Sequence, residues 1–237
     1  MFGKLFRQAS SLQRKKLITT QFLPEAPNSK AHSGFLYVAR SMAENIHSAL
    51  LSCPKPVHHV LFTGHSAGGA VASLIFAHFK MSRILGTLDP VVLVVVRSHV
   101  TLDELILDCI SFGAPPVMFP GEVIAHLHTS GSTFLAFVNH GDPVARADKP
   151  YIRLLLDVYS RPIPLPYLDF EAPELCNAGT VLLLYERNPD GDEDDIGISE
   201  VTNQMSNLLF GNVKVHQMRH YLTQIGAWKS AQIQEPS

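Results

Sequence analysis

Apolar residues recur at helical intervals in one early segment of the chain and gather into short runs further along. Between residues 35 and 52, apolar side chains fall three or four positions apart, which is the spacing of one face of an α-helix. These side chains are Phe35, Val38, Met42, Ile46 and Leu50. Pro54 and Pro56 follow closely, so we expect the helix to end before them, because proline lacks the amide hydrogen that continues a helix.

The short apolar runs have the length of β-strands and alternate with segments of helical spacing. We predict strands over residues 59–63, 90–96, 108–112, 133–139 and 180–185, and helices over 70–79, 121–128 and 213–228. The run at 90–96 also fits an apolar segment that leaves the sheet, since Arg97 and Asp103 follow it. Strands that alternate with helices indicate a mostly parallel sheet flanked by helices, which is the α/β class.

Residues 1–31 do not share this pattern. They are polar and basic, with a loop around Pro24 and Pro27. We expect them to form a poorly defined N-terminal extension rather than an element of the core. The α/β domain is then expected over residues 32–228, with a short C-terminal tail over 229–237.

The composition supports a folded domain and excludes some functions. Of the 237 residues, 46% are hydrophobic and 17% are charged, which is enough apolar material for a large core. The formal net charge of −2 lacks the basic excess typical of proteins that bind nucleic acids. Neither a signal-peptide core nor an apolar run of membrane-spanning length is present, so we expect a cytoplasmic location or peripheral association with a membrane.

The three cysteines, Cys53, Cys109 and Cys176, are far apart in the sequence and form no C-x-x-C pair. An odd number of widely spaced cysteines favours free thiols in a reducing compartment. A single disulfide in a secreted protein is the alternative.

The pentapeptide Gly64-His65-Ser66-Ala67-Gly68 is the strongest chemical signal in the chain. It lies between an apolar strand and a helix rich in small residues, where a G-x-S-x-G turn projects a serine hydroxyl above the sheet. We interpret its glycines as places where strand and helix approach too closely for a side chain. The N–H of Ala67, at the start of the helix, is a candidate oxyanion donor. An ordinary glycine turn is the alternative interpretation.

A serine nucleophile needs a base that is itself oriented by a carboxylate, and on an α/β-hydrolase fold these follow in the order acid, then histidine. Asp142 is the best candidate acid because it comes just after the strand at 133–139. Asp148 and Asp157 lie further into the loop and are weaker candidates. The alternative for Asp142 is an Asp-Pro turn.

Two histidines, His216 and His220, follow Asp142 in the chain. They are four positions apart, so one helical turn could place both on one face, and periodicity does not choose between them. The same spacing would suit a zinc pair. Without a third ligand or an intervening glutamate we expect no metal site, and nothing in the sequence calls for a cofactor.

The sequence around these residues resembles the class 3 lipase family, the fungal-lipase-like branch of the α/β-hydrolase fold. The similar blocks are residues 32–36 (HSGFL), 62–70 (FTGHSAGGA), 111–117 (SFGAPPV), 138–146 (VNHGDPVAR) and 216–222 (HQMRHYL). The last block is similar to the His-x-Met-x-x-Tyr-Leu form of many plant and eukaryotic members, which favours His216 as the base. A shorter histidine-to-tyrosine spacing in fungal members keeps His220 as the alternative.

The resemblance implies a serine hydrolase that cleaves lipid carboxylic esters, such as acylglycerols, through an acyl-enzyme. In that mechanism Ser66 attacks the ester, His216 transfers the proton and Asp142 orients the imidazole. The implied partners are the lipid ester substrate and, transiently, a membrane or lipid-droplet surface.

Two departures from the family pattern bear on activity. Ala67 stands where many members have leucine. The family also has upstream strands, and a turn whose backbone supplies a second oxyanion donor, whereas residues 1–31 show neither; Ile18–Phe22 would correspond to the lid region. We therefore expect an N-terminally truncated domain that lacks the first strands, and one missing oxyanion donor typically costs about 10²- to 10³-fold in rate.

Two other functions use the same residues. A lipase-like binding or interaction protein would keep the fold with weak catalysis, which the missing upstream strands favour and the complete Ser-Asp-His order opposes. An acyltransferase or an esterase for small esters would use the same three residues on another substrate.

Overall fold

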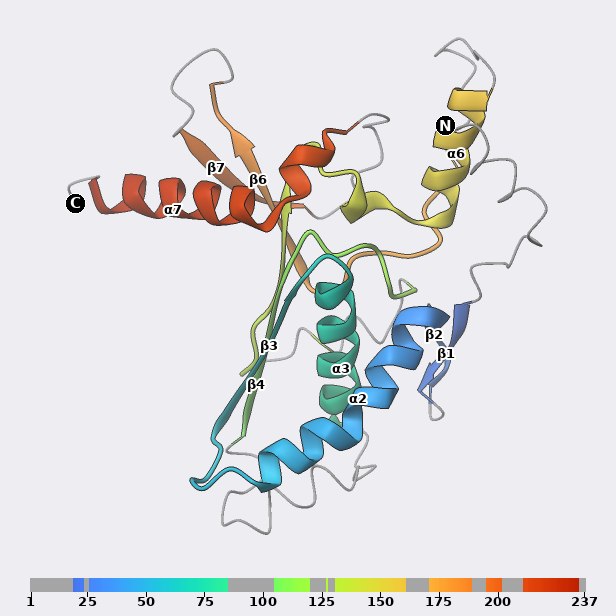
Figure 1. Ribbon diagram of the computed structural model, residues 1–237, viewed down its shortest axis with the longest axis vertical. Helices are drawn as coiled ribbons and strands as arrows, with labels where there is room; N and C mark the ends of the chain where they lie inside the picture. Colours follow the sequence, from blue (N-terminus) through green and yellow to red (C-terminus); the bar gives the residue numbers. More distant parts are fainter. Residues whose placement is uncertain are drawn as a thin grey trace, which may run out of the picture.

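The computed structural model describes residues 19–23, 26–84, 105–119, 127, 131–160, 171–188, 195–201 and 211–234. Their main feature is a sheet in the order β3-β4-β5-β6-β7 (Figure 1). The strands are β3 (His59–His65), β4 (Ile106–Phe112), β5 (Phe134–Asn139), β6 (Thr180–Glu186) and β7 (Ile196–Val201). The first four run parallel and β7 is antiparallel to β6, which confirms the expected mostly parallel sheet.

The register brings the ends of three strands to one edge of the sheet. His65 of β3 pairs with Phe112 of β4, and Phe112 pairs with Phe137 of β5. Because the strands are parallel, the residues that follow them leave the sheet from the same edge, where open α/β sheets place their functional groups. Ser66 and Gly113 are two of these residues.

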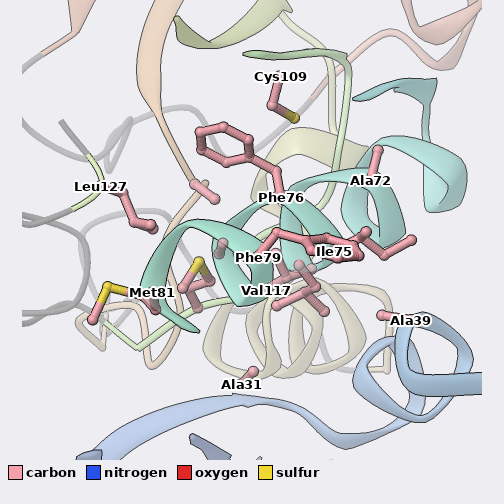
Figure 2. Close-up of a cluster of buried hydrophobic side chains, with 14 of the residues drawn as sticks. Ala31, Ala39, Ala72, Ile75, Phe76, Phe79, Met81, Cys109, Val117 and Leu127 are labelled. Carbon is pink, nitrogen blue, oxygen red and sulfur yellow. The ribbon is translucent and has the colours of Figure 1, made fainter. Parts of the chain in front are cut away.

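Helix α3 (Ala67–Ile84) is buried between the sheet and helix α2 (Ser33–Leu51). Phe76 of α3 is inaccessible to solvent, and its ring centroid lies 4.6 Å from that of Phe134 in β5. Figure 2 shows Phe76 with Ile75, Phe79 and Met81 of the same helix and with Cys109 of β4. This packing fixes the direction in which the first turn of α3 points.

The remaining helical segments lie later in the chain. They are η1 (Val144–Arg146), α6 (Lys149–Ser160), η3 (Val213–His216) and α7 (Met218–Gln234). Helix α7 packs against β7 and β5. In Figure 1 the segment that leads into α7 lies at the same end of the sheet as the first turn of α3.

Part of the predicted N-terminal extension belongs to the folded structure. Strands β1 (Thr19–Leu23) and β2 (Ala26–His32) form an antiparallel hairpin in which Phe22 and Ala31 are buried. The hairpin is joined to the domain by hydrogen bonds, since the His32 N–H donates to the Val117 carbonyl and Arg40 donates to the Phe22 carbonyl. For residues 19–23 and 26–31 the expectation of an extension outside the core is therefore wrong, because the short and largely polar stretches gave no apolar alternation by which a strand could be recognised.

Most of the predicted elements are present. The helix at 35–52 and the strands at 59–63, 108–112, 133–139 and 180–185 are confirmed, and α3 extends beyond 70–79 at both ends. The structure also contains α6 and β7, which the apolar pattern did not predict. The strand proposed at 90–96 and, apart from the buried Leu127, the helix proposed at 121–128 lie outside the described residues.

Candidate active site

The chain turns sharply between β3 and α3, and Ser66 lies at that turn. Its φ angle is 55°, in the left-handed region that residues other than glycine rarely adopt. The Ser66 N–H donates to the Phe112 carbonyl at 2.9 Å, and the Ala70 N–H donates to the Ser66 carbonyl at 3.1 Å. These two hydrogen bonds hold the strained turn. Helix α3 begins at Ala67, so the amides of its first turn and the positive end of its dipole lie beside Ser66.

The glycines around Ser66 differ in how strongly the structure requires them. A Cβ on Gly64 would lie 2.4 Å from the carbonyl carbon of Gly68, and a Cβ on Gly69 would lie 2.8 Å from the carbonyl oxygen of Gly64. A Cβ on Gly68 itself would meet nothing within 4 Å. The interpretation that crowding excludes a side chain is thus correct for Gly64 and wrong for Gly68. The crowded position on the helix is Gly69, one residue beyond the pentapeptide.

The imidazole of His216 lies between Ser66 and Asp142. Its Nε2 is 2.9 Å from Ser66 Oγ, and its Nδ1 is 2.9 Å from Asp142 Oδ2. A carboxylate only accepts hydrogen bonds, so Nδ1 carries the proton and Nε2 accepts from the serine hydroxyl. The structure therefore brings together three residues that the sequence singled out, in the order serine, aspartate, histidine.

Asp142 is a buried carboxylate with three hydrogen-bond donors. Its side chain is inaccessible to solvent, and its Oδ1 accepts from the Val144 N–H at 2.8 Å. Its Oδ2 accepts from both His216 Nδ1 and the Tyr221 hydroxyl, the latter at 2.6 Å. Burying an ionised carboxylate is costly unless donors replace the lost water, and these three donors do so.

Tyr221 is a residue of this site to which the sequence analysis assigned no role, although it belongs to the block at residues 216–222. It is fully buried, and its hydroxyl also accepts from the Asn139 N–H at 3.1 Å, so its own proton is directed to Asp142. Burial, reinforced by the charge of Asp142, raises the pKa of Tyr221 well above its usual value. The hydroxyl therefore stays protonated and remains a donor. The sequence feature that could have indicated this role is the position of Tyr221 five residues after His216, in the His-x-Met-x-x-Tyr-Leu block.

Gly113 leaves room for this cluster of polar groups. It follows β4 with a φ of 55°, and a Cβ at this position would lie 2.8 Å from Asp142 Oδ2 and 2.8 Å from the Tyr221 hydroxyl. The same Cβ would lie 3.0 Å from His216 Nδ1. A side chain at residue 113 would therefore displace the carboxylate from the imidazole.

The segment that carries His216 is held by hydrogen bonds from other parts of the chain. Asn139 Nδ2 donates to the Val215 carbonyl at 2.6 Å, and the Asn212 N–H donates to the Gly141 carbonyl at 2.9 Å. His65 Nε2 donates to the His216 carbonyl at 2.6 Å. Sequence spacing does not reveal these contacts, because each joins residues that are more than 70 positions apart.

The alternative acids and the alternative base occupy other surroundings. Asp148 accepts from the Tyr151 N–H at 3.1 Å and from the Glu174 N–H at 2.8 Å, so it caps the first turn of α6. Asp157 is exposed on α6. His220 lines a surface hollow together with His140 and Gln224, while His216 contacts Ser66 and Asp142.

The described residues include no group of three or more histidine, cysteine or acidic side chains arranged to hold a metal ion. His216 and His220 are thus not joined by a third ligand in this part of the chain.

Cys53, Cys109 and Cys176 are free, and burial raises the pKa of the Cys109 thiol to about 12. Among the helices described here, none is both long enough and apolar enough to cross a membrane.

Comparison with known structures supports the α/β-hydrolase fold. A triacylglycerol lipase whose catalytic centre is described as a serine protease triad superimposes with a TM-score of 0.52 at 18% identity, over 86% of this chain and 63% of its own. The Rhizomucor miehei triacylglyceride lipase gives a TM-score of 0.51 at 17% identity, over 90% of this chain and 66% of its own. The chain thus spans less than two thirds of the length of either lipase.

Comparison of sequences identifies the family. No curated protein sequence matches the chain. The profile of the class 3 lipases matches residues 6–151, which include Ser66 and Asp142 and also the hairpin formed by β1 and β2. That match extends over more than half of the 237 residues. The chain therefore belongs to the class 3 lipase family.

Proposed function

We propose that this chain hydrolyses lipid carboxylic esters, with Ser66 as the nucleophile, His216 as the base and Asp142 as the orienting acid. The observation that carries the proposal is the uninterrupted series of hydrogen bonds from Ser66 Oγ to His216 Nε2 and from His216 Nδ1 to Asp142 Oδ2, each 2.9 Å long. A serine hydroxyl is a weak nucleophile near neutral pH, and this arrangement supplies the base and the fixed tautomer that it needs.

The reaction proceeds in two halves. In the first, Ser66 Oγ attacks the ester carbonyl carbon while its proton passes to His216 Nε2, and the tetrahedral intermediate then expels the alcohol, which takes that proton. In the second, water gives a proton to His216 Nε2 and attacks the acyl-enzyme, and Ser66 leaves as its hydroxyl when the proton returns. Asp142 remains a carboxylate throughout and stabilises the imidazolium that forms in each half.

The Ala67 N–H is the proposed oxyanion donor. It belongs to the first turn of α3, whose amides have no carbonyl partner within the helix. The positive end of the helix dipole adds to the stabilisation of the negative charge that develops on the carbonyl oxygen.

The substrate class is inferred from the family. Its members are lipases, and the two superimposed structures are of triacylglycerol lipases, so an acylglycerol or a related lipid ester is the proposed substrate. Such substrates are held in membranes and lipid droplets, and we infer that the chain acts in transient contact with such a surface.

Hydrolysis of 4-nitrophenyl butyrate and of emulsified tributyrin tests the proposal. We expect Ser66→Ala to lower kcat by about 10³-fold or more on both esters, because removal of one member of a Ser-His-Asp unit removes most of its catalysis. Ser41→Ala, which changes an exposed serine on α2, is the matched control and should leave the rate unchanged. Equal activity of the wild type and Ser66→Ala would contradict the proposal. Release of a transesterified product when glycerol is added would instead favour an acyltransferase.

A further inference from the structure

We propose that His65, the residue before Ser66 in the G-x-S-x-G turn, is a positioning residue for His216. This inference depends on the proposed function, since it assigns His65 the task of holding the base at the correct distance from the nucleophile. His65 is the last residue of β3, and its Nε2 lies 2.6 Å from the carbonyl oxygen of His216. The contact therefore joins the residue next to the nucleophile to the backbone of the base.

The chemistry of this contact fixes the state of the His65 ring. A carbonyl oxygen only accepts hydrogen bonds, so Nε2 of His65 must carry a proton. The two imidazole rings also lie against each other, with centroids 4.6 Å apart and planes inclined at 32°. His65 thus restrains His216 twice, through the backbone carbonyl and through the face of the ring.

The other contacts of the base segment cannot replace this one. Asn139 donates to the Val215 carbonyl, and the Asn212 N–H donates to the Gly141 carbonyl, so these contacts connect the segment to the end of β5 and to the loop that follows it. They set the position of His216 relative to Asp142. Among the three hydrogen bonds made by Asn139, Asn212 and His65, the one from His65 connects the segment to the turn that carries Ser66.

The segment itself is short and locally weak. Residues Val213–His216 form a single 3-10 turn whose four residues are exposed or half-buried, so little packing would restrain it. Without the His65 contact, His216 can move away from Ser66 while it keeps its bond to Asp142. A misplacement of about 1 Å in a catalytic pair can cost on the order of 10²-fold in rate.

Glutamine and methionine at residue 65 separate hydrogen bonding from size. The amide nitrogen of glutamine can occupy the place of Nε2 and donate to the His216 carbonyl, whereas methionine has similar length and no donor. We would measure kcat and KM for 4-nitrophenyl butyrate, the rate of labelling by a fluorophosphonate, and the melting temperature for wild type, H65Q and H65M. The full chain is used throughout.

For H65M we expect kcat and the labelling rate to fall about 10- to 100-fold with KM within about twofold of wild type, while H65Q restores most of the loss. If H65M does not fold, His65→Asn serves instead. The asparagine side chain is too short for its amide nitrogen to reach the His216 carbonyl, so the same loss is expected. Equal kcat for H65Q and the variant that lacks the contact would overturn the inference. Absence of labelling in the wild type would overturn the proposed function instead, so the two failures are distinguishable.

Discussion

The turn at Ser66 and the segment that carries His216 meet through two hydrogen bonds, one from Ser66 and one from His65, yet they are held in different ways. The turn is fixed by backbone contacts: Gly64 and Gly69 allow strand and helix to touch, and the Ser66 peptide groups pair with Phe112 of the adjacent strand and with Ala70 of α3. The base segment is held by side chains from elsewhere, chiefly Asn139 and His65. The position of Ser66 therefore depends mainly on its local sequence and on one hydrogen bond to the adjacent strand, whereas the position of His216 depends on side chains that are far away in the chain.

The largest expected effect comes from removing the proposed base, His216. We predict that His216→Gln lowers kcat for 4-nitrophenyl butyrate by about 10³- to 10⁴-fold, since the serine then has no proton acceptor. His220→Gln is the matched control and should stay within about twofold of wild type, because His220 lines a separate hollow. A larger loss for His220→Gln than for His216→Gln would reverse the assignment of the base.

The next largest effect concerns the turn itself. Gly64→Ala places a Cβ 2.4 Å from the backbone of Gly68, and backbone cannot move aside cheaply. We expect a loss of about 2–3 kcal/mol or more in the free energy of unfolding, measured by urea denaturation. Gly68→Ala should be neutral or slightly stabilising, by up to about 1 kcal/mol, because the position is open and helical. Equal destabilisation by both substitutions would show that crowding is not what selects glycine at residue 64.

An intermediate effect is expected on the acid. Tyr221→Phe removes one of the three donors to Asp142 and leaves the ring in place, so kcat should fall about 10- to 100-fold, which corresponds to the roughly 1.5–3 kcal/mol typical of a hydrogen bond to a charged group. KM should be nearly unchanged, because Tyr221 is fully buried and its hydroxyl contacts Asp142 on the side chain's Oδ2. Tyr159→Phe on the exposed face of α6 is the control. An unchanged kcat for Tyr221→Phe would mean that His216 and Val144 suffice to hold the carboxylate.

The smallest effect should come from the other buried aspartate of this region. Asp148 caps α6 and contacts neither Ser66 nor His216, so Asp148→Ala should lower the free energy of unfolding by about 1 kcal/mol, the usual cost of a lost N-cap. Thermal denaturation measures this cost. Activity at a temperature well below the melting transition should stay within about twofold of wild type, and a loss as large as that of His216→Gln would point to Asp148 as a second acid.

The sequence predicted the sheet and the turn because both rest on local patterns. Apolar runs of strand length specify β3, β4, β5 and β6, and the pentapeptide around Ser66 specifies its own backbone. The hairpin of β1 and β2 was missed because, among its side chains that the structure describes, Phe22 is the one large buried residue, and the other buried ones, Ser29 and Ala31, are small. Helix α6 was missed although its half-buried Tyr151, Leu154, Leu155 and Val158 recur at helical intervals, because exposed apolar residues such as Leu156 lie between them and obscure the stripe.

The choice between His216 and His220 could not be made from spacing. Both lie near the start of the last helix, and only the path of η3 decides which imidazole turns toward Ser66. That path depends on Asn139 and His65, which precede His216 by 77 and 151 positions. The resemblance of residues 216–222 to the class 3 lipases favoured His216, and in the structure His216 is the histidine that lies between Ser66 and Asp142.

Mass spectrometry of the fluorophosphonate-labelled chain tests the central claim most directly. We predict one adduct on the folded wild type, mapped to Ser66, absent from Ser66→Ala and formed far more slowly in His216→Gln. Ser41→Ala should label like the wild type, since this serine lies on α2 away from the turn. An adduct on another residue, or a folded wild type that remains unlabelled, would contradict the claim that Ser66 is an activated nucleophile.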